Sequence, residues 1–176
     1  MTLRRLVRLA LLLGLCALLV WLDVATKAWA TTELARRGGR TLIDGHLVLR
    51  VQQNSGIAFG ILQPQLHPDK ARYLVTYKAA MAGALALLLA WRCLRAPGER
   101  LAPLGLVLLL AGTLGNMIDR AAEGTVTDFI DVRLGAWRWP AFNLADAFLA
   151  AGIALCLAAL LLGLRRRGGA AGARSG

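Results

Sequence analysis

Four long apolar stretches restrict what this 176-residue chain can fold into more than any other feature. They cover residues 9–22, 73–91, 101–118 and 144–164. About 20 apolar residues in a helix cross the hydrocarbon core of a bilayer, and the first stretch reaches that length when it is continued to residue 26. The sequence therefore predicts an all-α membrane protein. Its four transmembrane helices are expected at about 9–26, 72–92, 101–118 and 143–164.

Arginines gather in three short flanks of these helices and predict the orientation in the membrane. They precede the first helix, fill the link between the second and third, and follow the fourth: Arg4, Arg5, Arg8, Arg92, Arg95, Arg100, Arg165, Arg166, Arg167 and Arg174. Basic flanks favour the cytoplasmic side, so both termini are expected there. The segments 27–72 and 119–143 are then outside. These flanks also account for the net charge of +11, and without a separate soluble domain no nucleic-acid partner is expected.

The longer outer segment has a pattern typical of β-structure. The sequence "HLVLRVQQNSGIAFGIL" alternates, is rich in β-branched and apolar residues, and has Asn54-Ser55-Gly56 as a turn in its middle. Before it, "TTELARR" is expected to form a short helix that ends at Gly38-Gly39. We therefore expect a single integral-membrane domain over residues 1–164, with a small β-structured extracytoplasmic cap at about 41–62. The basic segment 165–176 is expected to be a flexible tail.

Polar residues lie where the bilayer makes them costly, and such residues indicate function. Asp146 is the only charged residue in 144–164. At the outer end of the first helix, Asp23 and Lys27 are four residues apart and can pair on one face. For this pair an interfacial structural role and a direct role both remain open.

Carboxamides and carboxylates flank the second outer segment at both ends. The third helix ends in "GNMIDR", with Asn116 and Asp119 three residues apart, and "FNLAD" has Asn143 and Asp146 at the same spacing. Between them, "VTDFIDV" adds two more acids, Asp128 and Asp131. We expect several of these acidic groups to converge on one outward-facing site.

Two carboxylates in close contact share a proton and titrate as a pair. The ionised member can then activate water while the protonated one hydrogen-bonds a scissile carbonyl, as in aspartic proteases. Spacing alone leaves Asp119 and Asp128 as equal candidates for the partner of Asp146.

Other interpretations of these acids remain open. Carboxylates could hold magnesium in a lipid-headgroup transferase, or Asp146 could relay protons in a small carrier. The polar groups could also merely join helices. The chain contains no serine-protease motif and no H-E-x-x-H zinc motif.

Five motifs together resemble one family. They are "DVATKAW", "NSGIAFGIL", "GNMIDR", "VTDF" and "PAFNLADAFLAAG". In this order and approximate spacing they are similar to lipoprotein signal peptidase, also called signal peptidase II, from about residue 9 to residue 164. The sequence departs from the family pattern at Ile57, Gly60 and Ala147, which bears on pocket shape and substrate preference.

The resemblance implies an intramembrane aspartic endopeptidase of the bacterial inner membrane, with its active site near the extracytoplasmic face. Its expected substrate is a prolipoprotein, cut before a diacylglyceryl-modified cysteine, and its expected inhibitors are globomycin-type peptides. The family match assigns the catalytic pair to Asp128 and Asp146. It implies supporting or substrate-contacting roles for Asp23, Lys27, Asn54, Gly56, Asn116, Asp119, Arg120 and Asn143. No metal or other cofactor is expected, membrane lipids are partners, and the protein is expected to act as a monomer.

Overall fold

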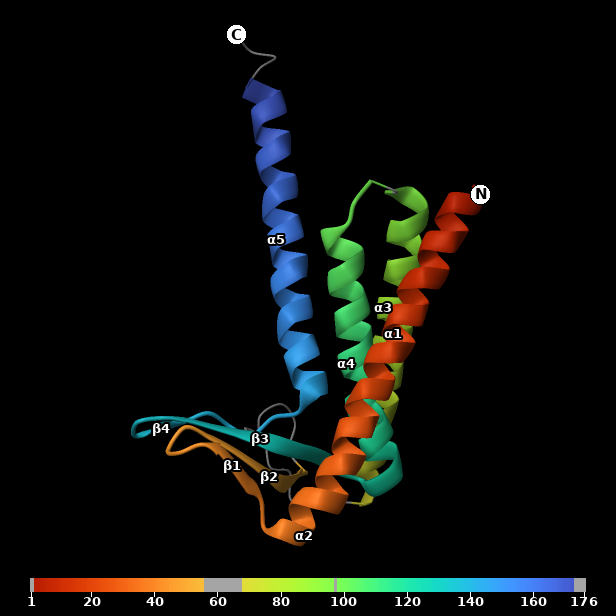
Figure 1. Ribbon diagram of the computed structural model, residues 1–176. Coiled ribbons are helices and arrows are strands. Elements are labelled where there is room, and N and C mark those ends of the chain that lie inside the picture. The colour runs from red at the N-terminus through yellow and green to blue at the C-terminus, as the bar shows by residue number, and fades with distance from the viewer. Residues whose placement is uncertain (1, 56–67, 97, 173–176) are drawn as a thin grey trace.

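The computed structural model describes residues 2–55, 68–96 and 98–172 (Figure 1). Its helices are α1 (Leu3–Trp29), the π-helical segment η1 (Ala30–Leu34), α2 (Ala35–Arg37), α3 (Pro68–Arg95), α4 (Leu101–Glu123) and α5 (Leu144–Gly172). Its strands are β1 (Arg40–Ile43), β2 (Leu47–Asn54), β3 (Val126–Leu134) and β4 (Trp137–Arg138).

Within the described part of the chain, four helices are long and apolar enough to cross a membrane, as the sequence predicted. These spans are Leu3–Arg37, Tyr73–Arg95, Leu101–Glu123 and Leu144–Leu164. In Figure 1, α1 begins and α5 ends at one end of the bundle, and the sheet lies at the opposite end. The fold therefore has a transmembrane layer and a smaller β-structured layer.

The first helical segment is longer than expected. It does not end near residue 26, because α1 continues through η1 and α2 as far as Arg37. The residues in "TTELARR" therefore extend the first helix, with one π-helical turn, and do not form a separate helix. Gly38 ends it with a left-handed backbone at φ 69°, which glycine adopts at little cost. The predicted stop at this glycine is confirmed.

The last helix is also longer than expected. The apolar part ends at Leu164, but α5 continues to Gly172. The first part of the segment expected to be a flexible tail is thus helical. The three arginines directly after Leu164 have high helix propensity, which favours continuation of the helix beyond the apolar stretch. Residues 173–176 lie outside the described residues.

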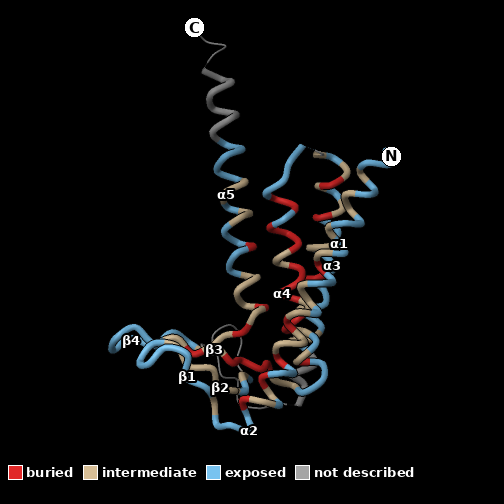
Figure 2. The backbone as a smooth tube through the Cα atoms, in the orientation of Figure 1, coloured by how far each residue is buried: buried red, intermediate tan, exposed pale blue. Residues whose placement is uncertain are grey.

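Helix α4 is the centre of the bundle, and Figure 2 shows buried residues along it. Glycines bring it close to α5. A Cβ atom on Gly105 would lie 2.9 Å from the carbonyl oxygen of Gly152, and one on Gly112 would meet the carbonyl oxygen of Ala145. Small residues allow helix backbones to approach within a membrane. This contact fixes the start of α5 against the outer end of α4.

Other faces of α4 pack against the first two spans. Val107 and Leu110 are buried in a cluster with Leu89 of α3 and Cys16 of α1. Cysteine behaves here as a small apolar side chain. This cluster holds the middle of α1 and the first half of α4 side by side.

The strands form one antiparallel sheet in the order β1-β2-β3-β4. Strand β2 comes from the first outer segment and β3 from the second, with Leu49 opposite Ile130 and Gln52 opposite Asp128. The sheet packs on the extended first helix, because Phe129 is buried with Ala30 and Leu34. The expectation of β-structure at 41–62 was therefore incomplete, since the second outer segment contributes β3 and β4. Residues 56–62 lie outside the described residues.

Candidate active site

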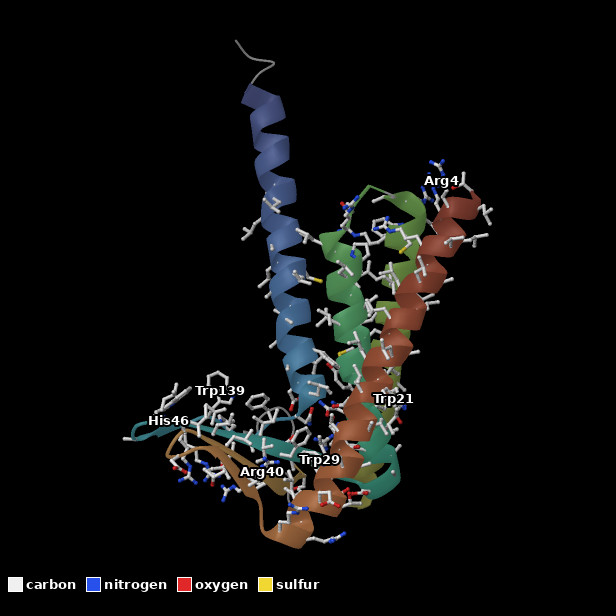
Figure 3. All side chains as sticks on the ribbon, in the orientation of Figure 1. Arg4, Trp21, Trp29, Arg40, His46 and Trp139 are labelled. Atoms are coloured by element: carbon white, nitrogen blue, oxygen red, sulfur yellow. The ribbon has the colours of Figure 1, made fainter. Side chains whose placement is uncertain are left out.

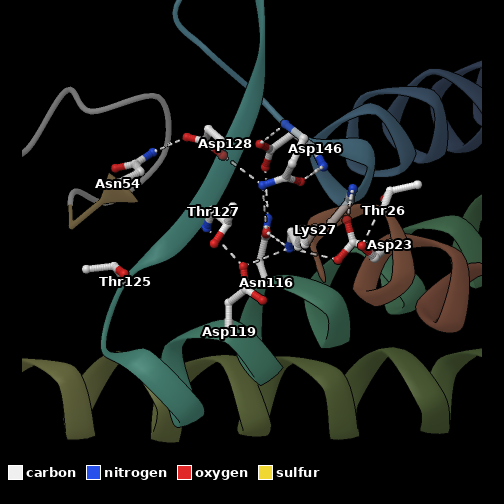
Figure 4. Close-up of polar contacts among 12 residues, drawn as sticks. Asp23, Thr26, Lys27, Asn54, Asn116, Asp119, Thr125, Thr127, Asp128 and Asp146 are labelled. Carbon is white, nitrogen blue, oxygen red and sulfur yellow. Dashed lines mark hydrogen bonds and ion pairs between the residues drawn. The ribbon is translucent and has the colours of Figure 1, made fainter. Parts of the chain in front are cut away.

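Asp128 is a buried carboxylate on β3 whose hydrogen-bond donors are neutral. The residue is 2% exposed. Its Oδ1 accepts from Asn143 Nδ2 at 2.8 Å, and its Oδ2 accepts from Asn54 Nδ2 at 2.9 Å. These contacts are drawn in Figure 4. Two amide side chains orient the carboxylate without supplying positive charge.

Burial raises the pKa of Asp128 from its ordinary value of 3.8 to about 6. The hydrogen bond from Asn54 opposes this shift, and the negative charge of Asp146 adds to it. The Asn143 hydrogen bond and the Lys27 charge lower the pKa by smaller amounts. Asp128 therefore holds a proton closer to neutral pH than an exposed aspartate does.

Asp146 lies in the first turn of α5, in a capping box with Asn143. Asn143 precedes the first helical residue and accepts the backbone N–H of Asp146 on its Oδ1 at 3.0 Å. In return, Asp146 Oδ2 accepts the backbone N–H of Asn143 at 3.2 Å. This reciprocal pattern satisfies two donors that the helix leaves unpaired. The other oxygen, Oδ1, accepts from Asn116 Nδ2 at 2.8 Å.

Asn143 connects the two carboxylates. Its Nδ2 donates to Asp128 and also to Asn116 Oδ1, at 3.1 Å, while its backbone N–H donates to Asp146. The residue is completely buried, so its amide cannot turn to water. One asparagine at the head of α5 thus holds Asp128 and Asp146 together.

Lys27 forms the centre of a second buried cluster beside this pair. Its Nζ lies 2.7 Å from Asp23 Oδ2 and 3.2 Å from Asp119 Oδ2, and it donates to Asn116 Oδ1 at 3.0 Å. The predicted pairing of Asp23 with Lys27 is confirmed, but the pair is buried and does not lie at a solvent interface. Gly115 leaves the space for the Asp23 carboxylate, because a Cβ there would meet it.

Asp119 and Arg120 support the site from the end of α4. Asp119 Oδ2 accepts the backbone N–H of Thr127 at 2.9 Å. Asp119 therefore bonds Lys27 and the backbone of β3, whereas Asn143 bonds both Asp128 and Asp146. Arg120 is buried, and its charge acts on Asp119, Asp128 and Asp146. Gly56, which the sequence also indicated, lies outside the described residues.

Asp131 does not join this site. It lies on the opposite face of β3 from Asp128, because side chains alternate along a strand. Arg138 Nε and Nη2 donate to its two oxygens at 3.0 and 2.7 Å, and Arg50 Nε lies 2.8 Å away. Arg133 Nη2 is at 3.9 Å. Asp131 is a structural anchor of the sheet.

An apolar cavity of about 370 Å³ opens beside Asp146. Apart from that carboxylate its lining is apolar, from the sheet and α5: Val132, Leu134, Trp137, Trp139, Phe142, Ala147 and Ala150. Figure 3 shows Trp139 on the sheet near the start of α5. Sequence reasoning missed the two tryptophans. The signal was the alternation Trp137-Arg138-Trp139, which puts both indoles on one face of a strand.

Among the described residues, no group of three or more His, Cys, Asp or Glu side chains has the arrangement of a metal site. In the second cluster, the carboxylates of Asp23 and Asp119 share Lys27. A cation from the protein occupies the place that a magnesium site would need between them.

Residues 15–162 match the family described as Signal peptidase (SPase) II. The chain is 36% identical over 154 residues to the lipoprotein signal peptidase of Desulforapulum autotrophicum, covering 87% of this chain and 91% of that one. It is 39% identical over 153 residues to that of Syntrophomonas wolfei, covering 86% and 94%. A bacterial membrane enzyme solved by the in meso method at 2.3 Å resolution has a similar fold. Its TM-score is 0.72 at 28% identity, covering 86% of this chain and 88% of that one.

Proposed function

Because the chain belongs to the signal peptidase II family, we propose that it cuts lipid-modified prolipoproteins before the diacylglyceryl cysteine, using Asp128 and Asp146. One observation carries the assignment of the two acids. Asn143 bonds both carboxylates, with its side-chain amide on Asp128 and its backbone N–H on Asp146. Neither Asp119 nor Asp131 has a comparable link to Asp146 among the contacts of the described residues.

The two carboxyls have different surroundings, which supports different roles. Asp128, with a pKa raised by burial to about 6, is suited to carry the proton. Asp146 accepts two N–H groups at the start of α5, where the helix dipole stabilises an anion. We therefore assign Asp128 as the acid and Asp146 as the base.

The reaction then needs only water and the two carboxyls. Asp146 takes a proton from water as the water oxygen attacks the scissile carbonyl carbon, and Asp128 gives its proton to the carbonyl oxygen. In the resulting gem-diol, Asp146 returns its proton to the leaving nitrogen and the C–N bond breaks. Asp128 recovers a proton from a hydroxyl group as the new carboxylic acid forms. Both acids end in their starting states.

The apolar cavity beside Asp146 supports a lipid-bearing substrate. Its walls offer aromatic and aliphatic surface at the head of a transmembrane helix, and each buried methylene contributes about 0.8 kcal/mol. An acyl chain of the modified cysteine can lie there while the peptide bond reaches the two carboxyls. Ala147 and Ala150 leave the space that larger side chains would fill.

The orientation in the membrane is also part of the proposal. The start of α1 and the end of α5 lie at one end of the bundle, and the sheet and the start of α5, which carry Asp128 and Asp146, lie at the opposite end (Figure 1). With arginine-rich flanks in the cytoplasm, the site is near the extracytoplasmic face of the bacterial inner membrane. The protein acts as a monomer without a cofactor and binds globomycin-type inhibitors.

The decisive experiment is cleavage of a diacylglyceryl-modified precursor by the purified protein in detergent with a chelator. Wild type is expected to release the signal peptide, whereas Asp128→Asn and Asp146→Asn lose the activity and keep their fold. The same precursor without its lipid is the substrate control and is expected to stay uncut.

Cleavage by either variant at the wild-type rate would exclude the assigned pair. Wild-type activity that disappears with the chelator would favour a metal-dependent enzyme. Proton flux into sealed vesicles without any cleaved product would favour a carrier.

A further inference from the structure

Lys27 is a cation that the reaction does not use directly. It is 3% exposed, which keeps it from touching a substrate in the described structure. Its three partners, Asp23, Asp119 and Asn116, come from two helices, α1 and α4. The functional question is what these partners hold in turn.

The first partner holds the start of α5. Asp23 Oδ2 contacts Lys27, and its Oδ1 accepts the backbone N–H of Ala145 at 2.8 Å. Ala145 is the residue directly before Asp146. The carboxylate of Asp23 is completely buried, so without the ammonium it would be a charge without a counter-ion. Lys27 thus stabilises the anchor that sets the backbone position of Asp146.

The second partner holds β3 in the same way. Asp119 Oδ2 contacts Lys27 at 3.2 Å and accepts the backbone N–H of Thr127 at 2.9 Å. Thr127 is the residue directly before Asp128. Both anchors therefore act one residue upstream of an acid, from opposite sides of a single ammonium group.

The third partner reaches a carboxylate directly. Lys27 donates to Asn116 Oδ1, and Asn116 Nδ2 donates to Asp146 Oδ1. An amide with its oxygen held by an ammonium cannot flip, so its N–H must face Asp146. Figure 4 shows this chain of contacts.

We propose that Lys27 is a positioning residue for the pair, which sets how Asp128 and Asp146 face each other through Asp23, Asp119 and Asn116. This inference rests on the proposed function, because it presumes that these two acids perform the cleavage. A role in folding alone would require only that α1 and α4 stay together. The contacts of Lys27 instead lead, through its three partners, to the backbone N–H groups of Ala145 and Thr127 and to the carboxylate of Asp146. These are positions on which the proposed reaction depends.

The test is Lys27→Met, which keeps the length of the side chain and removes the charge. We expect kcat to fall by roughly 100-fold, the cost of about 1 Å of misplacement, with little change in KM. Arg37→Met is the matched control, since Arg37 pairs with Glu33 at the exposed end of the same helical segment. It is expected to keep wild-type kinetics.

The pH profile separates positioning from a loss of folded protein. Asp128 faces Asp146 of α5, Arg120 of α4 and Lys27 of α1. Removing the Lys27 charge raises the pKa of Asp128, so the alkaline limb of kcat/KM is expected to move to higher pH. A smaller folded fraction would lower the rate at every pH and leave the limb in place.

Rescue supplies an independent measurement. In Lys27→Met, the negative charge of Asp23 is left buried, and adding Asp23→Asn removes that charge while an amide oxygen still accepts from Ala145. The double variant is expected to cleave faster than Lys27→Met alone. If Lys27→Met does not fold, Lys27→Gln, which retains a donor, is compared with wild type in the same way.

The outcomes distinguish the two proposals. If wild type does not cut the lipidated precursor, the proposed function fails. If wild type cuts it and the folded Lys27 variant has wild-type kcat with an unshifted alkaline limb, only the positioning role is overturned. The kcat of the double variant is also compared with those of the single variants Lys27→Met and Asp23→Asn. If its fold-loss of kcat equals the product of the two single fold-losses, the two residues act independently and the positioning role is overturned.

Discussion

Strand β3 carries two buried aspartates on opposite faces, and they differ in the charge of the groups that bond them. Asp128 and Asp131 are three residues apart and are both almost inaccessible to solvent. Asp128 accepts hydrogen bonds from the neutral amides of Asn54 and Asn143. Asp131 instead faces three guanidinium groups, which come from β2, β3 and β4.

Equal burial therefore has different consequences, because the charge of the partners differs. A buried carboxylate whose hydrogen-bond donors are neutral tends to keep its proton, and burial raises the pKa of Asp128 to about 6. A buried carboxylate surrounded by arginines stays paired and joins the strands that supply them. One face of β3 thus carries a carboxyl group with a raised pKa, the proposed catalytic acid, and the other carries a carboxylate that joins three strands.

Matched substitutions on the two faces give the largest expected contrast. Asp128→Asn is expected to lower kcat by roughly 1,000-fold or more, because the proposed general acid is lost. Asp131→Asn should keep the kcat of the folded protein while unfolding at lower temperature, with a loss of about 2 kcal/mol because charge-assisted hydrogen bonds to the arginines are weakened. Cleavage assays and thermal unfolding in detergent measure both. Equal loss of kcat in the two variants would contradict the distinction between the faces.

The pH dependence of stability tests the raised pKa of Asp128. Between pH 3.8 and about 6, the folded state binds more protons at Asp128 than the unfolded state does. The stability contributed by this group therefore falls as pH rises through that window, by at most about 3 kcal/mol, and is constant above it. Asp128→Asn should remove this part of the slope in a series of unfolding temperatures. If the unfolding temperatures of wild type and Asp128→Asn changed with pH in parallel, the raised pKa of Asp128 would be disproved.

A cation placed beside Asp128 should make it resemble Asp131. Asn54→Lys brings an ammonium group to Asp128 Oδ2, lowers the pKa of that carboxyl and weakens it as an acid. We expect kcat/KM to fall by roughly 30-fold and its alkaline limb to move to lower pH. Gln53→Lys is the control, because Gln53 bonds Thr125 and Thr127 and does not contact Asp128. An unshifted limb in Asn54→Lys would show that partner charge is not what separates the two aspartates.

Neighbouring residues of β4 provide the smallest contrast. Trp137 lines the apolar cavity, whereas Arg138 bonds Asp131. Trp137→Ala is expected to raise KM for the lipidated precursor by roughly 10-fold, since apolar contact area is lost. Arg138→Ala should lower the unfolding temperature and leave KM unchanged. The reverse assignment of the two effects would mean that the lipid does not use this face.

Several features could be predicted because they depend on short distances along the chain. The spans follow from runs of apolar residues. The Asp23–Lys27 pair and the link between Asn143 and Asp146 follow from spacings of four and three residues on a helix. Side chains alternate along a strand. If "VTDFIDV" had been recognised as a strand, the sequence would also have predicted that Asp128 and Asp131 lie on opposite faces.

Hydropathy and local spacing in the sequence thus determined the four membrane helices, the head of α5 and the set of polar candidates. Only the tertiary structure decided which of them meet. The pairing of Gln52 with Asp128, and the contacts of Lys27 with Asp119 and Asn116, join segments more than 70 residues apart. No periodicity encodes such contacts, because they depend on how α1, α4 and the sheet pack in space. That packing brings Asp128, and not Asp119 or Asp131, to Asn143, whose backbone N–H bonds Asp146.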